Sequence, residues 1–324
     1  QDPEIRRSIT EIGMVKNVEV TGKDVLVEIY LTVSGCPLKE EIIKRVTKAV
    51  EEIDNSAQTK VVLDVMNDEQ RKKLKEYKEN FELFANEQIK ILPKDASKGF
   101  IPFELNIAQR IVNEKIEEQR KSTGKVRAIV LKARQQGLST YTTARVFWKS
   151  YFNAYNKSVV MAHDSATSDA LFTMSRNTIQ YMADDFRPSF KKSNAKEIMF
   201  EHNDSGYRLY TAGSPEAGRG TTPTIAHLSE VAFWTHDEKI LAGLFQGISE
   251  SDGTEVILES TANGVGNAFH RLWLGAVRGE NEYIAIFIPW FLTPEYTREA
   301  PVDFKLEPEE IIIKEKFNLS NNQL

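Results

Sequence analysis

The pattern of apolar and polar positions changes character from about Leu74. From Gly124 onwards, short apolar runs alternate with stretches of helical periodicity. This rhythm predicts a mostly parallel sheet with helices on both faces, an α/β fold. The expected strands cover residues 128–131, 158–162, 207–210, 224–228, 255–259 and 283–288. In such sheets ligands bind at the carboxyl ends of the strands, so functional residues are sought there.

The first 74 residues follow a different pattern. Residues 15–20 and 25–33 alternate apolar and polar side chains around a Thr-Gly-Lys-Asp turn, which is a hairpin signal. Residues 37–53 have helical periodicity, and 61–65 have the composition of a third strand. We therefore predict a small N-terminal α+β domain over residues 1–74.

Between these two parts, the sequence predicts a charged helix over residues 73–88, a loop or short hairpin over 89–101, and a helix over 106–121. The expected domains after residue 74 are a helical segment (75–125), an α/β core (126–306) and a linker (307–324).

One loop carries the strongest chemical signal. Residues Lys132 to Thr140 read Lys-Ala-Arg-Gln-Gln-Gly-Leu-Ser-Thr and directly follow an apolar strand. The usual phosphate-binding pattern is G-x-x-x-x-G-K-[ST]. Here Leu138 takes the place of that lysine, and Lys132 stands at the front of the loop. Gly137 lets backbone amides close on an anion, and the helix that opens at Ser139 favours phosphate at its N-terminus. The sequence thus predicts a P-loop NTPase with a displaced lysine.

Different loop residues are expected to contact the metal ion and the phosphates. A hydroxyl of Ser139 or Thr140 can reach Mg²⁺. The β- and γ-phosphates of ATP are expected against the Lys132 side chain and the backbone amides of Gln135, Gln136, Gly137 and Ser139.

Two further strand ends add candidate residues. One strand ends in Ser229-Glu230, and a carboxylate just past a buried strand can polarise the attacking water. Ser229 stands where an aspartate usually holds Mg²⁺ through a water, and serine is a weaker but feasible ligand. Ser260 and Thr261 follow another strand, and their hydroxyls can sense the γ-phosphate or a bound water. Viewed in isolation, that segment also fits a simple Asn-Gly turn.

Outside the loop and the strand ends, a glutamine and two arginines complete the candidate site. The amide of Gln109 can pair with a donor and an acceptor on the adenine edge, although a lone glutamine also fits a surface position. Arg219, between glycines, can stabilise transition-state charge in trans on a neighbouring subunit. Arg134 is the rival for that role in cis, and either arginine can instead form a surface ion pair.

These elements together resemble the ATPase domain of phage terminase large subunits over about residues 75–324. The resemblance rests on the order and spacing of Gln109, the loop Lys132 to Thr140, His227-Leu-Ser-Glu230, Ser260-Thr-Ala262 and Ile288-Pro-Trp-Phe. It implies that Lys132 is the phosphate lysine, that Glu230 is the catalytic glutamate and that Arg219 is an intersubunit arginine finger.

The resemblance also implies a role and partners. Such a motor uses ATP and Mg²⁺ to pump double-stranded DNA into a procapsid. It acts as a homo-oligomeric ring with a portal protein and a small terminase subunit, in the cytoplasm of the host cell. Large subunits usually continue into a nuclease domain, and the resemblance ends near where that domain would begin. The chain is therefore expected to hydrolyse ATP without cutting DNA.

The N-terminal part resembles the small domain in front of Mrp-type iron–sulfur carrier ATPases. The resemblance rests on Asp2-Pro-Glu-Ile, Glu11-Ile-Gly-Met-Val15, the run from Ser34 to Glu41 and the run from Val65 to Gln70. A fusion is expected, with its junction near residues 71–75. Cys36 precedes a helix start that favours thiolate, and it fits a small buried hydrophobe equally well.

Charge and length weigh on the alternatives. The net charge of −5 argues against a constitutive nucleic-acid coat, but not against a motor with a local basic surface. A helicase-type translocase shares the loop and the glutamine, but too few residues follow Trp290 for a second lobe. A third alternative is a nucleotide or iron–sulfur binding module without turnover.

Overall fold

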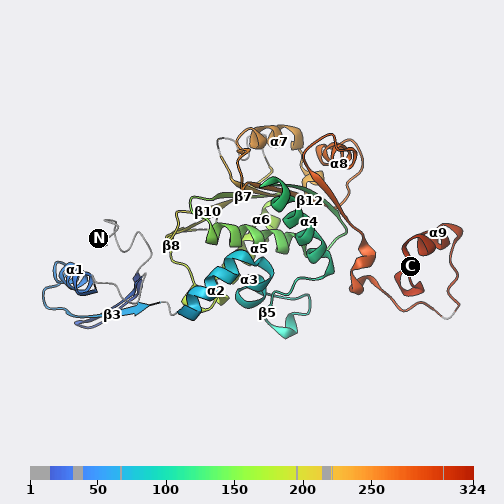
Figure 1. Ribbon diagram of the computed structural model, residues 1–324. Coiled ribbons are helices and arrows are strands. Elements are labelled where there is room, and N and C mark those ends of the chain that lie inside the picture. The colour runs from blue at the N-terminus through green and yellow to red at the C-terminus, as the bar shows by residue number, and fades with distance from the viewer. Residues whose placement is uncertain are drawn as a thin grey trace.

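An eight-stranded sheet organises the larger part of the molecule (Figure 1). The computed structural model describes residues 15–31, 39–65, 68–194, 196–213, 220, 222–301 and 303–324. The strands of this sheet are β6 (Val126–Lys132), β7 (Lys157–Ala162), β8 (Phe190–Ser193), β9 (Glu197–Phe200), β10 (Gly206–Thr211), β11 (Ile225–Ser229), β12 (Glu255–Ser260) and β13 (Ile284–Ile288). Their spatial order is β13-β6-β12-β11-β7-β10-β9-β8.

The sheet is mostly parallel, which confirms the predicted α/β fold. Every pairing from β13 across to β10 is parallel, and these six strands match the six apolar runs of the sequence. β9 and the edge strand β8 pair antiparallel and were not predicted. β8 escapes a search for apolar runs because it contains two lysines and only half-buried or exposed side chains, and β9 is only four residues long.

Helices cover both faces of the large sheet. One face carries α4 (Ile107–Thr123), α5 (Leu138–Phe152) and α6 (Ser165–Tyr181), and the other carries α7 (Asp237–Phe245) and α8 (Ala268–Arg278) (Figure 1). Alternate residues of each strand supply the two cores: Val160 and Ile257 pack in the first, Met161 and Leu258 in the second. Within the described residues, no helix combines the length and apolar character needed to cross a membrane.

The helix predicted over residues 73–88 is in fact two helices, α2 (Asp68–Glu79) and α3 (Phe81–Gln88). Asn80 separates them, since its backbone is extended and its side chain accepts a hydrogen bond from the Leu83 amide (3.0 Å). An N-cap asparagine satisfies an amide that the new helix leaves unpaired. The predicted hairpin that follows is confirmed as β4 (Lys90–Ile91) and β5 (Ile101–Pro102).

The N-terminal sheet contains β1 (Val15–Thr21), β2 (Asp24–Leu31) and β3 (Gln58–Val65), with α1 (Lys39–Glu51) packed on it. This mixture confirms the predicted α+β character, and Cys36 lies outside the described residues. The last α-helix is α9 (Pro308–Phe317). Short 3₁₀ turns are η1 (Ala96–Lys98), η2 (Asp184–Phe186), η3 (Val231–Phe233), η4 (Trp290–Leu292), η5 (Pro294–Tyr296) and η6 (Asn321–Gln323).

A buried ion pair ties α5 to the sheet beneath it. Arg145 Nε and Nη2 donate to the two carboxylate oxygens of Glu255 at 2.7 and 2.9 Å, and Nη2 also donates to Glu117 (2.7 Å). The side chains of Arg145 and Glu255 are each only 1% exposed. Burial alone would raise the pKa of Glu255, but Arg145 and Lys149 outweigh it and lower that pKa to about 2. The carboxylate therefore stays charged inside the protein.

Candidate nucleotide-binding and hydrolysis site

The phosphate loop has the backbone geometry of an anion site. It joins the end of β6 to the start of α5 over residues 133–137. Gln135 (φ 55°) and Gly137 (φ 73°) both adopt left-handed backbone conformations, which turn the chain sharply into α5. The N-cap of α5 is Gly137 itself, so no side chain of that residue covers the first amides of the helix. Free amides at a helix N-terminus bind phosphate through hydrogen bonds and the helix dipole.

Gln109 braces this loop. Its amide nitrogen donates to the carbonyl of Gly137 (2.7 Å), and its amide oxygen accepts from the backbone of Asn106 (2.9 Å). The side chain is therefore engaged at both atoms with protein backbone, and the residue is buried. The predicted contact of Gln109 with the adenine edge stays a prediction, and it would require one of these bonds to be exchanged.

Replacing Gly137 with alanine is expected to weaken nucleotide binding by at least about tenfold, which corresponds to about 1.4 kcal/mol. An added Cβ would lie 2.6 Å from Gln109 Nε2, and the positive φ of this position is unfavourable for alanine. Titration calorimetry with ADP measures the change. The matched control is Gly213→Ala, where a Cβ meets no atom within 4 Å. Unchanged affinity in Gly137→Ala would contradict a role for this turn in binding.

The exit segment after β13, residues 289–296, contacts the phosphate loop from outside. The buried Gln136 side chain accepts from the Ala133 amide (3.0 Å) and donates to the Pro289 carbonyl (2.9 Å) and to Thr293 Oγ1 (3.1 Å). The Tyr296 hydroxyl donates to the Arg134 carbonyl. The Arg134 side chain is exposed. Gln136 therefore fastens the loop, and only its backbone is available for a phosphate.

Lys132 lies between two carboxylates at the carboxyl ends of the central strands. Its Nζ is 2.6 Å from Glu230 Oε1 and 3.0 Å from Glu259 Oε2, and its side chain is 6% exposed. Burial alone would lower the pKa of Lys132, but Glu259 and Glu230 outweigh it and raise that pKa. The structure thus brings the displaced lysine to the glutamate that the sequence singles out.

Ser260 at the end of β12 and Thr261 just after it hold the second oxygen of Glu230. Glu230 Oε2 accepts from the Thr261 amide (3.1 Å), from Ser260 Oγ (3.3 Å) and from Thr261 Oγ1 (3.4 Å). Glu230 itself has a left-handed backbone (φ 53°), which is uncommon for a residue other than glycine. Such backbone geometry is found at functional sites, where neighbouring groups fix it. The two hydroxyl residues therefore contact the candidate catalytic glutamate in this structure, and their contact with a γ-phosphate stays a prediction.

The sequence prediction missed Glu259. Its side chain is fully buried, and its Oε1 accepts from Ser139 Oγ at 2.7 Å. His227 Nε2 lies 3.3 Å from the same oxygen. Burial would raise the pKa of Glu259, but Lys132, with His227 and Ser139, outweighs it and holds that pKa well below the usual range. The available signal was a carboxylate that directly follows the apolar residues Val256-Ile-Leu258 near the end of a predicted strand.

The structure places the two hydroxyl candidates for metal binding in different surroundings. Ser139 contacts Glu259, whereas Thr140 lines a small hollow beside Ile89 and Met174. Ser229 lies opposite Glu259 in the register of β11 and β12, and its hydroxyl is buried without a partner among the described residues. This geometry therefore favours Ser139 over Thr140 as the candidate metal ligand. Arg219 lies outside the described residues, so its predicted role stays untested.

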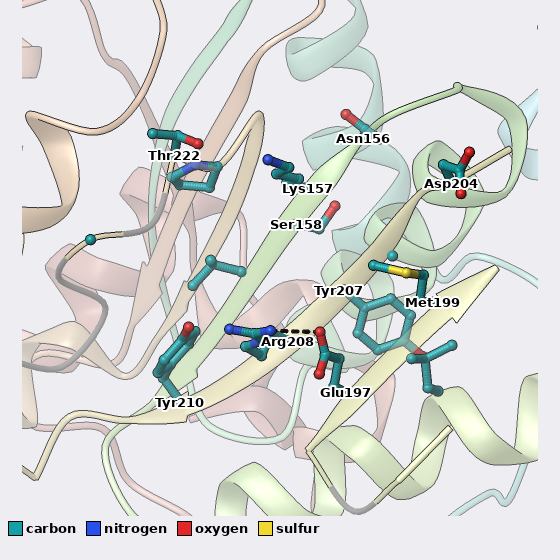
Figure 2. A pocket seen from close by; sticks show the side chains of 15 residues that line it. Asn156, Lys157, Ser158, Glu197, Met199, Asp204, Tyr207, Arg208, Tyr210 and Thr222 are labelled. Atoms are coloured by element: carbon teal, nitrogen blue, oxygen red, sulfur yellow. Dashed lines mark hydrogen bonds and ion pairs between the residues drawn. The ribbon is translucent and has the colours of Figure 1, made fainter. Parts of the chain in front are cut away.

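A separate hollow of about 270 Å³ lies along β7 and β10 (Figure 2). Arg208 on its floor donates to Glu197 at 2.7 Å. None of the phosphate-loop residues lines it. This hollow therefore lies apart from the candidate nucleotide site.

Comparison with protein families gives two matches. Residues 129–313 match the family described as terminase large subunit, T4likevirus-type, N-terminal. Residues 1–63 match the family described as iron-sulfur cluster assembly protein. Both resemblances expected from the sequence, and the fusion between them, are thereby confirmed.

Two curated relatives are iron-sulfur cluster carrier proteins. The protein of Mycobacterium leprae (strain TN) is 48% identical over 103 residues, which are 32% of this chain and 23% of that protein. The protein of Mycobacterium tuberculosis (strain ATCC 25618 / H37Rv) is 57% identical over 76 residues, 23% of this chain and 20% of that protein. The chain thus spans about a quarter or less of the length of these relatives.

Among solved structures, one large terminase shares the fold of the larger part of the chain. The large terminase of bacteriophage HK97 has a TM-score of 0.53 at 15% identity and covers 76% of this chain and 48% of that chain. The large terminase ATPase domain of Thermus phage P74-26 has a TM-score of 0.44 at 14% identity. That match covers 71% of this chain and 96% of that chain. At such identities the HK97 likeness establishes the fold alone.

Proposed function

Since this chain belongs to the terminase large subunit family, we propose that it hydrolyses ATP to drive double-stranded DNA into a viral procapsid. The observation that carries the proposal is the position of Lys132, between Glu230 and Glu259 and beside the left-handed phosphate loop. A cation, a candidate base and a set of free amides thus meet at one edge of a parallel sheet, where such sheets bind ligands.

The proposed reaction uses these residues in order. The phosphates of ATP lie against the amides from Gln135 to Ser139, and Lys132 exchanges its ion pairs for the β- and γ-phosphates. That exchange frees one oxygen of Glu230, which takes a proton from the water attacking the γ-phosphorus while the bond to ADP breaks. A bound Mg²⁺ would supply positive charge to the phosphate oxygens. The Ser139 hydroxyl would hold it, with Ser229 through a water.

The proposal also covers the assembly. Arg219 completes the site of a neighbouring subunit, so full activity requires a homo-oligomeric ring. Double-stranded DNA, a portal protein and a small terminase subunit are the partners, and the motor works in the cytoplasm of the infected host cell. These points rest on the family and on the chemistry of the residues named above.

The test is steady-state ATP hydrolysis by this chain at increasing protein concentration, with Mg²⁺ and with EDTA. We expect turnover that requires Mg²⁺ and that rises per subunit as the concentration increases. Absence of hydrolysis with Mg²⁺ at every concentration would contradict the ATPase. Constant turnover per subunit would contradict the arginine in trans, and duplex unwinding by the chain alone would favour a helicase-type translocase.

A further inference from the structure

A carboxylate lies on the strand next to the one where the expected metal-binding aspartate is absent. β11 ends in Ser229, which has no charge to orient the water ligands of a cation. β12 lies next to β11 in parallel register, and Ser229 is paired with Glu259. Paired residues of parallel strands share a face, and neighbouring strands lie about 4.8 Å apart. Glu259 is one methylene longer than aspartate, which covers part of that displacement.

The contact of Glu259 with the loop serine supports this assignment. Ser139 Oγ donates to Glu259 Oε1 at 2.7 Å, so the carboxylate already orients the hydroxyl expected to ligate the metal. His227 Nε2, 3.3 Å from the same oxygen, braces the carboxylate from β11. Partners of this kind, which orient a ligand rather than bind the metal themselves, contribute strongly to metal affinity.

An orphaned polar atom marks room for a bound water. The Ser229 hydroxyl is fully buried and has no hydrogen-bond partner among the described residues. Buried polar groups are nearly always paired, and an ordered water or ion commonly explains the exceptions. A water in the coordination shell of Mg²⁺ would supply this partner. Mg²⁺ keeps several waters and takes few protein ligands when phosphates are present, so one carboxylate and one hydroxyl suffice.

We propose that Glu259, acting through water, is the carboxylate that positions Mg²⁺ on the Ser139 hydroxyl, in place of an aspartate at position 229. The proposal rests on the proposed nucleotide site. The competing role for Glu259 is to hold Lys132 alone, since the two groups are 3.0 Å apart. The two roles differ in what they do to metal affinity when nucleotide is present.

The experiment measures Mn²⁺ affinity of the protein–ADP complex by electron paramagnetic resonance and, separately, metal-free ADP affinity by calorimetry in EDTA. In Glu259→Gln we expect Mn²⁺ affinity to fall by about 10–100-fold. Adding Ser229→Asp to that variant returns a carboxylate to β11 and is expected to restore most of the lost affinity. The matched control is Glu309→Gln on α9, an exposed residue that should leave both affinities unchanged.

Each outcome decides between the roles. Unchanged Mn²⁺ affinity in Glu259→Gln overturns the proposal, and so does a loss that Ser229→Asp fails to recover. If Glu259→Gln loses metal-free ADP binding, the Mn²⁺ measurement is made on Glu259→Asp instead. Aspartate keeps the negative charge but has a shorter side chain. Mn²⁺ affinity in Glu259→Asp must then fall about tenfold or more. A parent chain that binds no ADP in either buffer overturns the proposed function as well, which separates the two failures.

Discussion

Replacing Glu230 with glutamine is expected to lower the kcat of ATP hydrolysis by about 10²–10⁴-fold, the usual contribution of a general base. Glutamine keeps the shape of the side chain and an oxygen that accepts from the Thr261 amide, a contact of 3.1 Å in the structure. It removes the negative charge that accepts the proton from water. Steady-state phosphate release with Mg²⁺-ATP measures the loss.

The Glu230→Gln variant also provides an internal control, because ADP binding and ATP hydrolysis should respond differently to the loss of this charge. Lys132 keeps Glu259 as a partner when Glu230 loses its charge, so affinity for ADP should change by less than about threefold, or 0.7 kcal/mol. Glu307→Gln at the start of α9 serves as the exposed comparison and should leave kcat unchanged. Retention of parental kcat in Glu230→Gln would remove this residue from the chemistry.

Replacing Arg145 with methionine is expected to destabilise the larger domain by about 3–5 kcal/mol, the cost of leaving a buried charge without its partner. Glu255 would lose a two-bond contact inside the protein, and Lys149, 2.8 Å from Glu255 Oε1, compensates only in part. Urea unfolding followed by tryptophan fluorescence measures the free energy of unfolding.

Two comparisons test the reason for this loss. The double variant Arg145→Met with Glu255→Leu removes both charges and should recover most of the stability. Arg208→Met breaks a pair on the surface, where the Arg208 side chain is 51% exposed, and should cost no more than about 1 kcal/mol. Equal losses for Arg145→Met and Arg208→Met would mean that burial does not set the cost.

The loop and the strand end at Glu230 could be predicted because local sequence encodes them. An apolar run, a left-handed turn at Gly137 and a helix follow one another within one short segment, and the run ending at Ser229-Glu230 is equally local. Glu259 could not be found in this way. Its importance depends on β12 lying between β6 and β11, and strand order is set by packing of the whole sheet.

Two further features depended on side chains that bind backbone groups. Gln109 was assigned to the adenine edge from its chemistry, whereas the structure engages its amide with the Gly137 carbonyl (2.7 Å). The break between α2 and α3 at Asn80 was missed because the charged periodicity continues across it. In both cases a side chain satisfies a backbone group. The Gly137 carbonyl is identified as a partner only in three dimensions, whereas the Leu83 amide lies three residues after Asn80 and is a local N-cap partner.

The contacts between the phosphate loop and the exit segment have a mechanical consequence. Gln136 is bonded to Pro289 and Thr293, and the Arg134 carbonyl accepts from Tyr296. These bonds couple the loop, where we propose that nucleotide binds, to the exit segment, which leads on to α9. A shift of the loop on losing phosphate must either break them or pull the exit segment with it. Each turnover would then deliver a displacement to the end of the chain farthest from the N-terminal domain.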